Sequence, residues 1–132
     1  RGIPEANNVF IPCTHKMANV YEVFKRFLLE AGDDCPTALI AMNDLSAIGA
    51  IRAAEDAGLR VPEDLSVIGV DNIPLGDYLH RKLTTIEQPI ETMAEAAVRM
   101  LLKRLSDQEI DFQTMRFDSK LIIKETTAKV RT

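Results

Sequence analysis

The chain has 132 residues, 46% hydrophobic and 27% charged, which is enough for one hydrophobic core and too little for two comfortable domains. Its net charge is −4, and its lysines and arginines form no stripe, so nucleic-acid binding by this stretch alone is not expected. No apolar run approaches the ~20 residues of a membrane-spanning helix. Two cysteines without CxxC or zinc-ligand spacing predict no disulfide scaffold and no metal, and they favour a reduced cytoplasmic setting.

The first residues, Arg1–Pro4, lack the basic, apolar and small-residue regions of a signal peptide. The chain also does not begin with methionine. We therefore expect a fragment or a processed chain.

Apolar runs of strand length alternate with amphipathic helical patterns along the chain. In chain order they predict a strand at Val9–Pro12, a helix at Met17–Ala31, a strand at Thr37–Met42, a helix at Leu45–Ala57, a strand at Leu65–Val70, a loop at Asp71–Lys82, a strand at Leu83–Glu87, a helix at Ile90–Leu105, a polar loop at Ser106–Gln113, a strand at Met115–Glu125 and a frayed tail at Thr126–Thr132. This alternation is typical of an α/β fold with a mostly parallel sheet and crossover helices. Gly32 and Gly58 end the first two helices, and Pro89 opens the third.

Polar residues stand where the four strand-like runs before the last helix stop. His15 follows the first run, Asn43 and Asp44 follow the second, Asp71 follows the third, and Gln88 follows the fourth. Ligands of open parallel sheets bind outside the carboxyl ends of the strands. These residues therefore predict one wall of a small-molecule site.

Each of these residues also has a purely structural interpretation. Asn43 or Asp44 caps the following helix; one side chain is enough for that, which leaves the second free to face the crevice. Asp71 could begin a turn through its own side chain. Gln88 could be a connector before Pro89, and His15 could simply terminate a strand.

The chain has no convincing catalytic constellation. It contains no GxSxG elbow, no GxxxxGK[ST] loop and no GxGxxG fingerprint, and its two histidines have no metal-ligand spacing. Its serines fall in a helical pattern, in a strand, and in or near a polar loop, and no nucleophile–base pairing stands out. We therefore expect no enzyme activity and no cofactor.

Four segments resemble the LacI/GalR family of transcriptional regulators. They are Pro36–Ala50 (PTALIAMNDLSAIGA), Gly58–Asn72 (GLRVPEDLSVIGVDN), Leu83–Pro89 (LTTIEQP) and the closing Leu121–Thr127 (LIIKETT). Each match alone would be weak, but together they follow the order of the family across most of the chain. The usual Gly-Asp-aromatic run is replaced here by Cys13–Thr14–His15.

The resemblance implies a periplasmic-binding-protein-like fold, in which two Rossmann-like lobes close on a sugar or nucleobase effector. Residues 1–132 would form a single partial domain, the C-terminal lobe, with a helix at about 90–106 crossing to the other lobe and with the operator-binding domain absent. Asn43 and Asp71 match effector-binding positions, Gln88 matches a hinge position, and His15 falls where a ligand contact often lies. The family forms dimers, and the matching interface positions are Leu45, Ile48 and Leu79.

Three functions remain open from the sequence. The leading one is the effector-binding and dimerisation region of a cytoplasmic regulator. A periplasmic sugar receptor of a transporter would have the same fold, although the LTTIEQP and KETT segments favour the regulator. The third is an enzyme on this scaffold, which would need a nucleophile paired with a base. The proposed interface positions also have a structural alternative, because Leu45 and Ile48 could be ordinary core residues.

Overall fold

The computed structural model describes residues 8–106 and 113–129. Its sheet has four strands in the order β1-β2-β3-β4. They are β1 (Ala38–Ile40), β2 (Ser66–Val70), β3 (Thr84–Glu87) and β4 (Lys120–Ile122). The first three are parallel and β4 is antiparallel to β3, with Ala38 opposite Ser66, Ile68 opposite Thr84 and Thr85 opposite Ile122. The predicted α/β class is confirmed.

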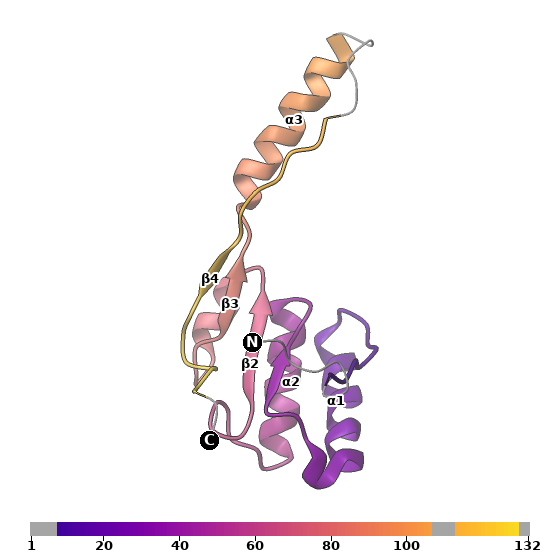
Figure 1. The fold of residues 1–132 in the computed structure, drawn as a ribbon, viewed down its shortest axis with the longest axis vertical. Coiled ribbons are helices and arrows are strands. Elements are labelled where there is room, and N and C mark those ends of the chain that lie inside the picture. The colour runs from indigo at the N-terminus through magenta and orange to yellow at the C-terminus, as the bar shows by residue number, and fades with distance from the viewer. Residues whose placement is uncertain (1–7, 107–112, 130–132) are drawn as a thin grey trace.

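Helices α1 (Met17–Ala31) and α2 (Asp44–Asp56) pack against each other, and α2 packs against β2 (Figure 1). Small residues allow this close approach: a Cβ atom built on Gly49 would overlap the carbonyl group of Met17. Beneath them, Leu65, Val67 and Leu83 are fully buried. The core therefore lies among α2, the central strands and the face of α1 that carries Val20, Phe24 and Leu28.

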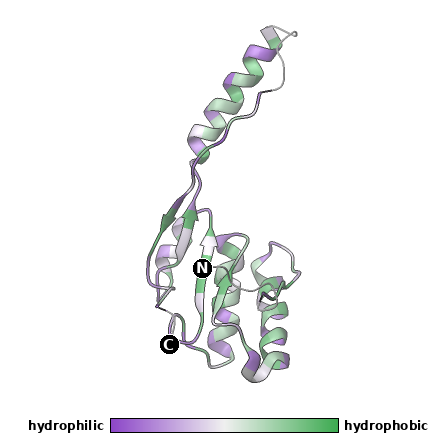
Figure 2. Ribbon diagram, viewed as in Figure 1, coloured by the Kyte–Doolittle hydropathy of each residue, from purple (hydrophilic) through white to green (hydrophobic). Residues whose placement is uncertain are grey.

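The third helix, α3 (Ile90–Ser106), projects from the carboxyl edge of the parallel strands, away from this core (Figure 1). None of its residues is buried, although apolar residues run along its length (Figure 2). It is flanked by the segment before β4, because Met115 and Phe117 line a hollow with α3 residues. No helix in the described ranges is long and apolar enough to cross a membrane.

Two predictions at the ends of the chain are wrong. Val9–Pro12 is not a strand; it lies along an apolar hollow with β1 and α1 instead of pairing in the sheet. The tail is not frayed at Thr126, which is fully buried because its hydroxyl donates to the carbonyl of Val67 at 2.8 Å and accepts from the Thr84 N–H at 2.9 Å. The rest of the predicted tail from residue 130 lies outside the described residues, as do residues 107–112 of the predicted loop.

The predicted closing strand was also too long. Only Lys120–Ile122 pairs with β3, because residues 113–117 lie beside α3 instead of beside the sheet.

Candidate functional site

Three of the predicted site residues lie at one edge of the sheet. Asn43 follows β1, Asp71 follows β2 and Gln88 follows β3, and these strands are parallel. The edge that they share is the one from which α3 projects (Figure 1). This is the edge at which open parallel sheets bind their ligands.

The backbone turns sharply after β2. Asp71 and Asn72 have φ angles of 111° and 53°, values that non-glycine residues adopt seldom and at a cost in free energy. Three consecutive N–H groups hold this turn: Asp71 donates to the carbonyl of Ile86 at 2.9 Å, Asn72 donates to Thr85 Oγ1 at 3.3 Å, and Ile73 donates to Asp44 Oδ2 at 2.8 Å. Strained residues held in this way are found where ligands bind.

The structure brings Asp71 and Gln88 together. Gln88 Nε2 donates a hydrogen bond to Asp71 Oδ1 at 2.9 Å. Both residues line a cavity of about 470 Å³ at the junction of β3 and α3. Its other polar walls are Glu87, Glu91, Thr92, Asp118 and Lys120. The cavity can therefore offer both hydrogen-bond acceptors and hydrogen-bond donors to a polar molecule.

Asn43 serves as the N-cap of α2. Its Oδ1 accepts from the Ser46 N–H at 2.8 Å, which is the structural interpretation that the sequence left open. Its side chain is half-buried and is not among those lining the cavity beside Asp71. His15 is exposed in the segment before α1 and is also not among them.

Replacing Asn43 by alanine should lower the free energy of unfolding by about 1 kcal/mol, because one N–H group of α2 loses its cap. Serine at this position should restore most of the loss, which urea unfolding of the three proteins measures. If the serine variant keeps its stability but loses effector binding, Asn43 is a ligand contact as well as a cap. A serine variant that keeps both restricts Asn43 to the cap.

Asp44 has a role that the sequence did not predict. It was expected to face the crevice if Asn43 capped the helix, but it is only 1% exposed and is bound inside the protein. Its Oδ1 accepts from the Thr85 hydroxyl at 2.6 Å, and its Oδ2 accepts from the Ile73 N–H. The carboxylate thus joins α2 to β3 and to the turn after β2.

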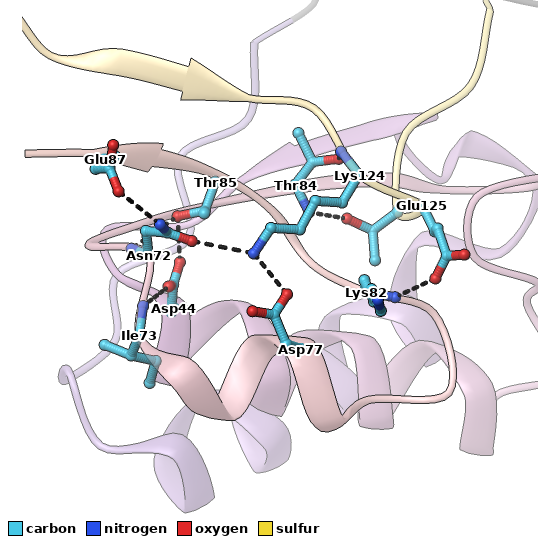
Figure 3. A network of polar contacts seen from close by, with 11 residues as sticks. Asp44, Asn72, Ile73, Asp77, Lys82, Thr84, Thr85, Glu87, Lys124 and Glu125 are labelled. Atoms are coloured by element: carbon cyan, nitrogen blue, oxygen red, sulfur yellow. Dashed lines mark hydrogen bonds and ion pairs between the residues drawn. The ribbon is translucent and has the colours of Figure 1, made fainter.

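A second polar network joins the same turn to the end of the chain (Figure 3). Asn72 Nδ2 donates to Glu87 Oε1 at 2.8 Å, and Asn72 Oδ1 accepts from Lys124 Nζ at 3.0 Å. Lys124 Nζ also donates to Asp77 Oδ1 at 2.8 Å. The hydrogen bond from this ammonium group holds the pKa of Asp77 below its ordinary value of 3.8. The turn is therefore fixed to both β3 and the segment that follows β4.

We expect the Asp77–Lys124 pair to stabilise the fold at neutral pH and to lose this effect in acid. The pKa of Asp77 is lower in the folded chain than in the unfolded chain, so the contribution is present above the unfolded pKa and disappears as the pH falls through the folded pKa. The difference in unfolding free energy between the wild type and Asp77→Asn should shrink from neutral pH to about pH 3. Urea unfolding at several pH values measures it; a constant difference would contradict the assignment.

The predicted interface residues lie on another face of the molecule. Ile48 and Leu79 line a mostly apolar hollow of about 440 Å³, together with Met17, Tyr21 and Arg52. Leu45 is not among its lining residues, but it stands one turn before Ile48 on α2 and is 42% exposed. Within the part of the chain that the structure describes, no three acidic, histidine or cysteine side chains gather to hold a metal ion.

Comparisons with known proteins agree with this architecture. The profile of the periplasmic binding protein-like domain matches residues 2–127. The HTH-type transcriptional repressor PurR of Photobacterium profundum is 34% identical over 125 residues, which are 95% of this chain and 37% of the repressor. PurR of Yersinia enterocolitica is 45% identical over 93 residues, which are 70% of this chain and 27% of that protein.

Solved structures give the same picture. A LacI family transcriptional regulator from Enterococcus faecium, with bound ribose, has a TM-score of 0.84 and 32% identity over 98% of this chain and 47% of its own. A regulator of this family from Arthrobacter, in complex with lactose, has a TM-score of 0.76 and 31% identity over 88% of this chain and 43% of its own. The chain thus spans about a third of the curated relatives and less than half of these structures.

Proposed function

The chain belongs to the periplasmic binding protein-like domain family, in the form found in LacI-family transcriptional regulators, and we propose that it is the C-terminal lobe of such an effector-binding domain. The alternative of a periplasmic solute receptor does not fit these relatives, which are transcriptional regulators or repressors. The proposed protein works in the cytoplasm, where it reaches operator DNA through a domain outside this stretch, and it binds its effector without turnover.

The observation that carries the proposal is the Asp71 turn. Its strained backbone is held by three N–H groups, and its carboxylate lies beside the Gln88 amide on a polar cavity at the ligand-binding edge of the sheet. A carboxylate that accepts and an amide that donates suit the hydroxyl groups of a sugar or the edge of a purine base. Such a site rejects molecules that leave its polar groups unpaired, at about 1–3 kcal/mol for each group.

We propose Asp71 and Gln88 as the main ligand contacts of this lobe, with Asn43 and His15 as further contacts that the other lobe brings into reach. Neither Asn43 nor His15 lines the Asp71 cavity in the isolated lobe. The effector class is a sugar or a purine base: the solved relatives hold ribose or lactose, and the curated relatives are PurR repressors.

The exposed helix α3 supports the proposed two-lobe arrangement. All of its described residues lie outside the core, and it starts directly after Gln88 and Pro89. In the proposed protein, α3 crosses to the other lobe, so that closure on an effector bends the chain at this junction. The effector then shifts the equilibrium between open and closed forms by the difference in its affinity for the two.

We also propose that the regulator is a homodimer through the hollow lined by Ile48 and Leu79, with Leu45 at its margin. An apolar hollow bordered by a charged side chain such as Arg52 is typical of protein interfaces, whose centres are apolar and whose rims are polar.

Isothermal titration of the full-length protein with D-ribose, lactose and hypoxanthine tests the proposal. We expect one of these classes to bind and to be recovered chemically unchanged. Conversion of a bound compound into a product would replace the regulator proposal with an enzyme. The absence of binding by all three would remove the sugar and purine classes named here.

A further inference from the structure

Thr85 joins three elements beneath the Asp71 turn. It is 1% exposed on β3, and its hydroxyl donates to Asp44 Oδ1 at 2.6 Å while accepting from the Asn72 N–H at 3.3 Å. The other oxygen of Asp44 accepts from the Ile73 N–H at 2.8 Å (Figure 3). A closed set of contacts therefore runs from β3 through the start of α2 to the turn.

The buried carboxylate of Asp44 needs an explanation beyond the start of a helix. Asn43 already caps α2, and burial of a charged group is costly unless donors surround it. The donors observed here are the Ile73 N–H, which lies in the turn, and the Thr85 hydroxyl, which also accepts from the turn. The carboxylate is therefore placed to hold the turn.

Gly69 on β2 gives independent support. A Cβ atom built at this position would overlap Asp44 Oδ1 and would come within 3.1 Å of Leu83 Cδ2. The absence of a side chain leaves the space in which the carboxylate lies against β2. Glycine at position 69 therefore lets the Asp44 carboxylate lie against β2, where it reaches Thr85 and Ile73.

We infer that Thr85 and Asp44 are positioning residues that hold Asp71 and Asn72 in their left-handed conformation and so present the Asp71 carboxylate to the effector. The inference rests on the proposed function of Asp71 and adds to it two residues that do not line the ligand cavity. Without the hydroxyl of Thr85, one N–H of the strained turn and one oxygen of Asp44 lose their partner. The turn then relaxes toward other conformations, and the effector must reorganise it on binding.

The chain offers a matched pair of variants for the test. Thr84 is also 1% exposed and also uses its hydroxyl, which accepts from the Lys124 N–H at 2.9 Å, but it points to the opposite face of the sheet. Thr84→Val and Thr85→Val therefore remove the same group at the same depth. Both are made in the full-length protein, with Thr85→Ser as the conservative variant that keeps the hydroxyl.

Two readouts decide the inference: the affinity for D-ribose, lactose or hypoxanthine, whichever the wild type binds, and hydrogen exchange of the Asn72 and Ile73 amides without ligand. We expect Thr85→Val to weaken binding by about threefold to tenfold and to speed exchange at both amides. Thr84→Val should change both much less, because the Thr84 hydroxyl reaches the turn only indirectly, through the backbone of Lys124, whose ammonium group binds Asn72. Thr85→Ser should restore both. Equal behaviour of the two valine variants, at similar melting temperatures, would overturn the inference.

Two further outcomes remain informative. If Thr85→Val does not fold, Thr85→Cys takes its place; it is close in shape to Thr85→Ser, but its thiol forms much weaker hydrogen bonds, and it should behave as described for valine. If the wild type binds none of the three probes, the sugar and purine proposal fails, while exchange still tests the support of the turn. Unchanged exchange in Thr85→Val or Thr85→Cys would overturn the positioning role in either case.

Discussion

Replacement of Asp71 by asparagine in the full-length protein should weaken binding of the proposed effector by about tenfold to a hundredfold. A hydrogen bond from a ligand hydroxyl to a charged acceptor is worth about 1.5–3 kcal/mol, and asparagine removes the charge while keeping the size of the side chain. Asparagine also tolerates the positive φ angle of this position, and Gln88 can still donate to its oxygen. The variant therefore changes the ligand contact and leaves the turn in place, and isothermal titration measures its effect.

Asp64 supplies the matched control for this experiment. It stands just before β2, as Asp71 stands just after it, and its carboxylate binds Arg60 at the opposite end of the strand. Asp64→Asn should leave effector affinity within about twofold of the wild type, since it removes a charge that is distant from the ligand edge. If Asp71→Asn also keeps the wild-type affinity, Asp71 is only a turn residue.

The helices show how much of this fold could be predicted from sequence. The bounds of α1 were predicted correctly, and those of α2 and α3 differ by one residue, because apolar spacing and stop residues are local signals. Gly32 and Gly58 have φ angles of 53° and 84°, as glycines that end helices commonly do. The strands were harder, because a strand depends on its partner. The apolar run Val9–Pro12 and most of the run from Met115 to Glu125 do not pair, although their composition suits a strand.

The meeting of these residues at one edge of the sheet could be predicted, but the contacts that each of them makes could not. The sequence places Asn43, Asp71 and Gln88 after successive parallel strands, and the structure finds them at one edge. Asn43 caps α2 and Asp44 is buried, although both are common capping residues. Their roles differ because Asp44 contacts β3 and the turn, which lie more than 25 residues away in the sequence. The support of the turn by Thr85 was missed for the same reason: its neighbours in the sequence do not include Asp44 or Asn72.

The dimer interface gives the second prediction, since a charge placed in the proposed apolar centre should separate the two copies. Leu79→Arg should raise the dissociation constant of the dimer by about a hundredfold or more, because burial of a guanidinium group in a mostly apolar contact is strongly unfavourable, although Glu55 is among the lining residues. Leu79 lines the hollow with Ile48 and Met17, so its replacement alters the centre of the proposed contact. Sedimentation equilibrium of the full-length protein measures the change.

Leu75→Arg is the matched control for this interface. Leu75 lies in the same turn of 3-10 helix, Pro74–Tyr78, that leads to Leu79, and it is 47% exposed outside the residues that line the hollow. It should leave the dimer intact. Effector binding per chain should persist in Leu79→Arg, because the ligand edge and the hollow have no lining residue in common, and this result separates loss of the dimer from misfolding. A Leu79→Arg protein that remains dimeric would place the interface elsewhere, and Leu45→Arg would then show whether the start of α2 belongs to it.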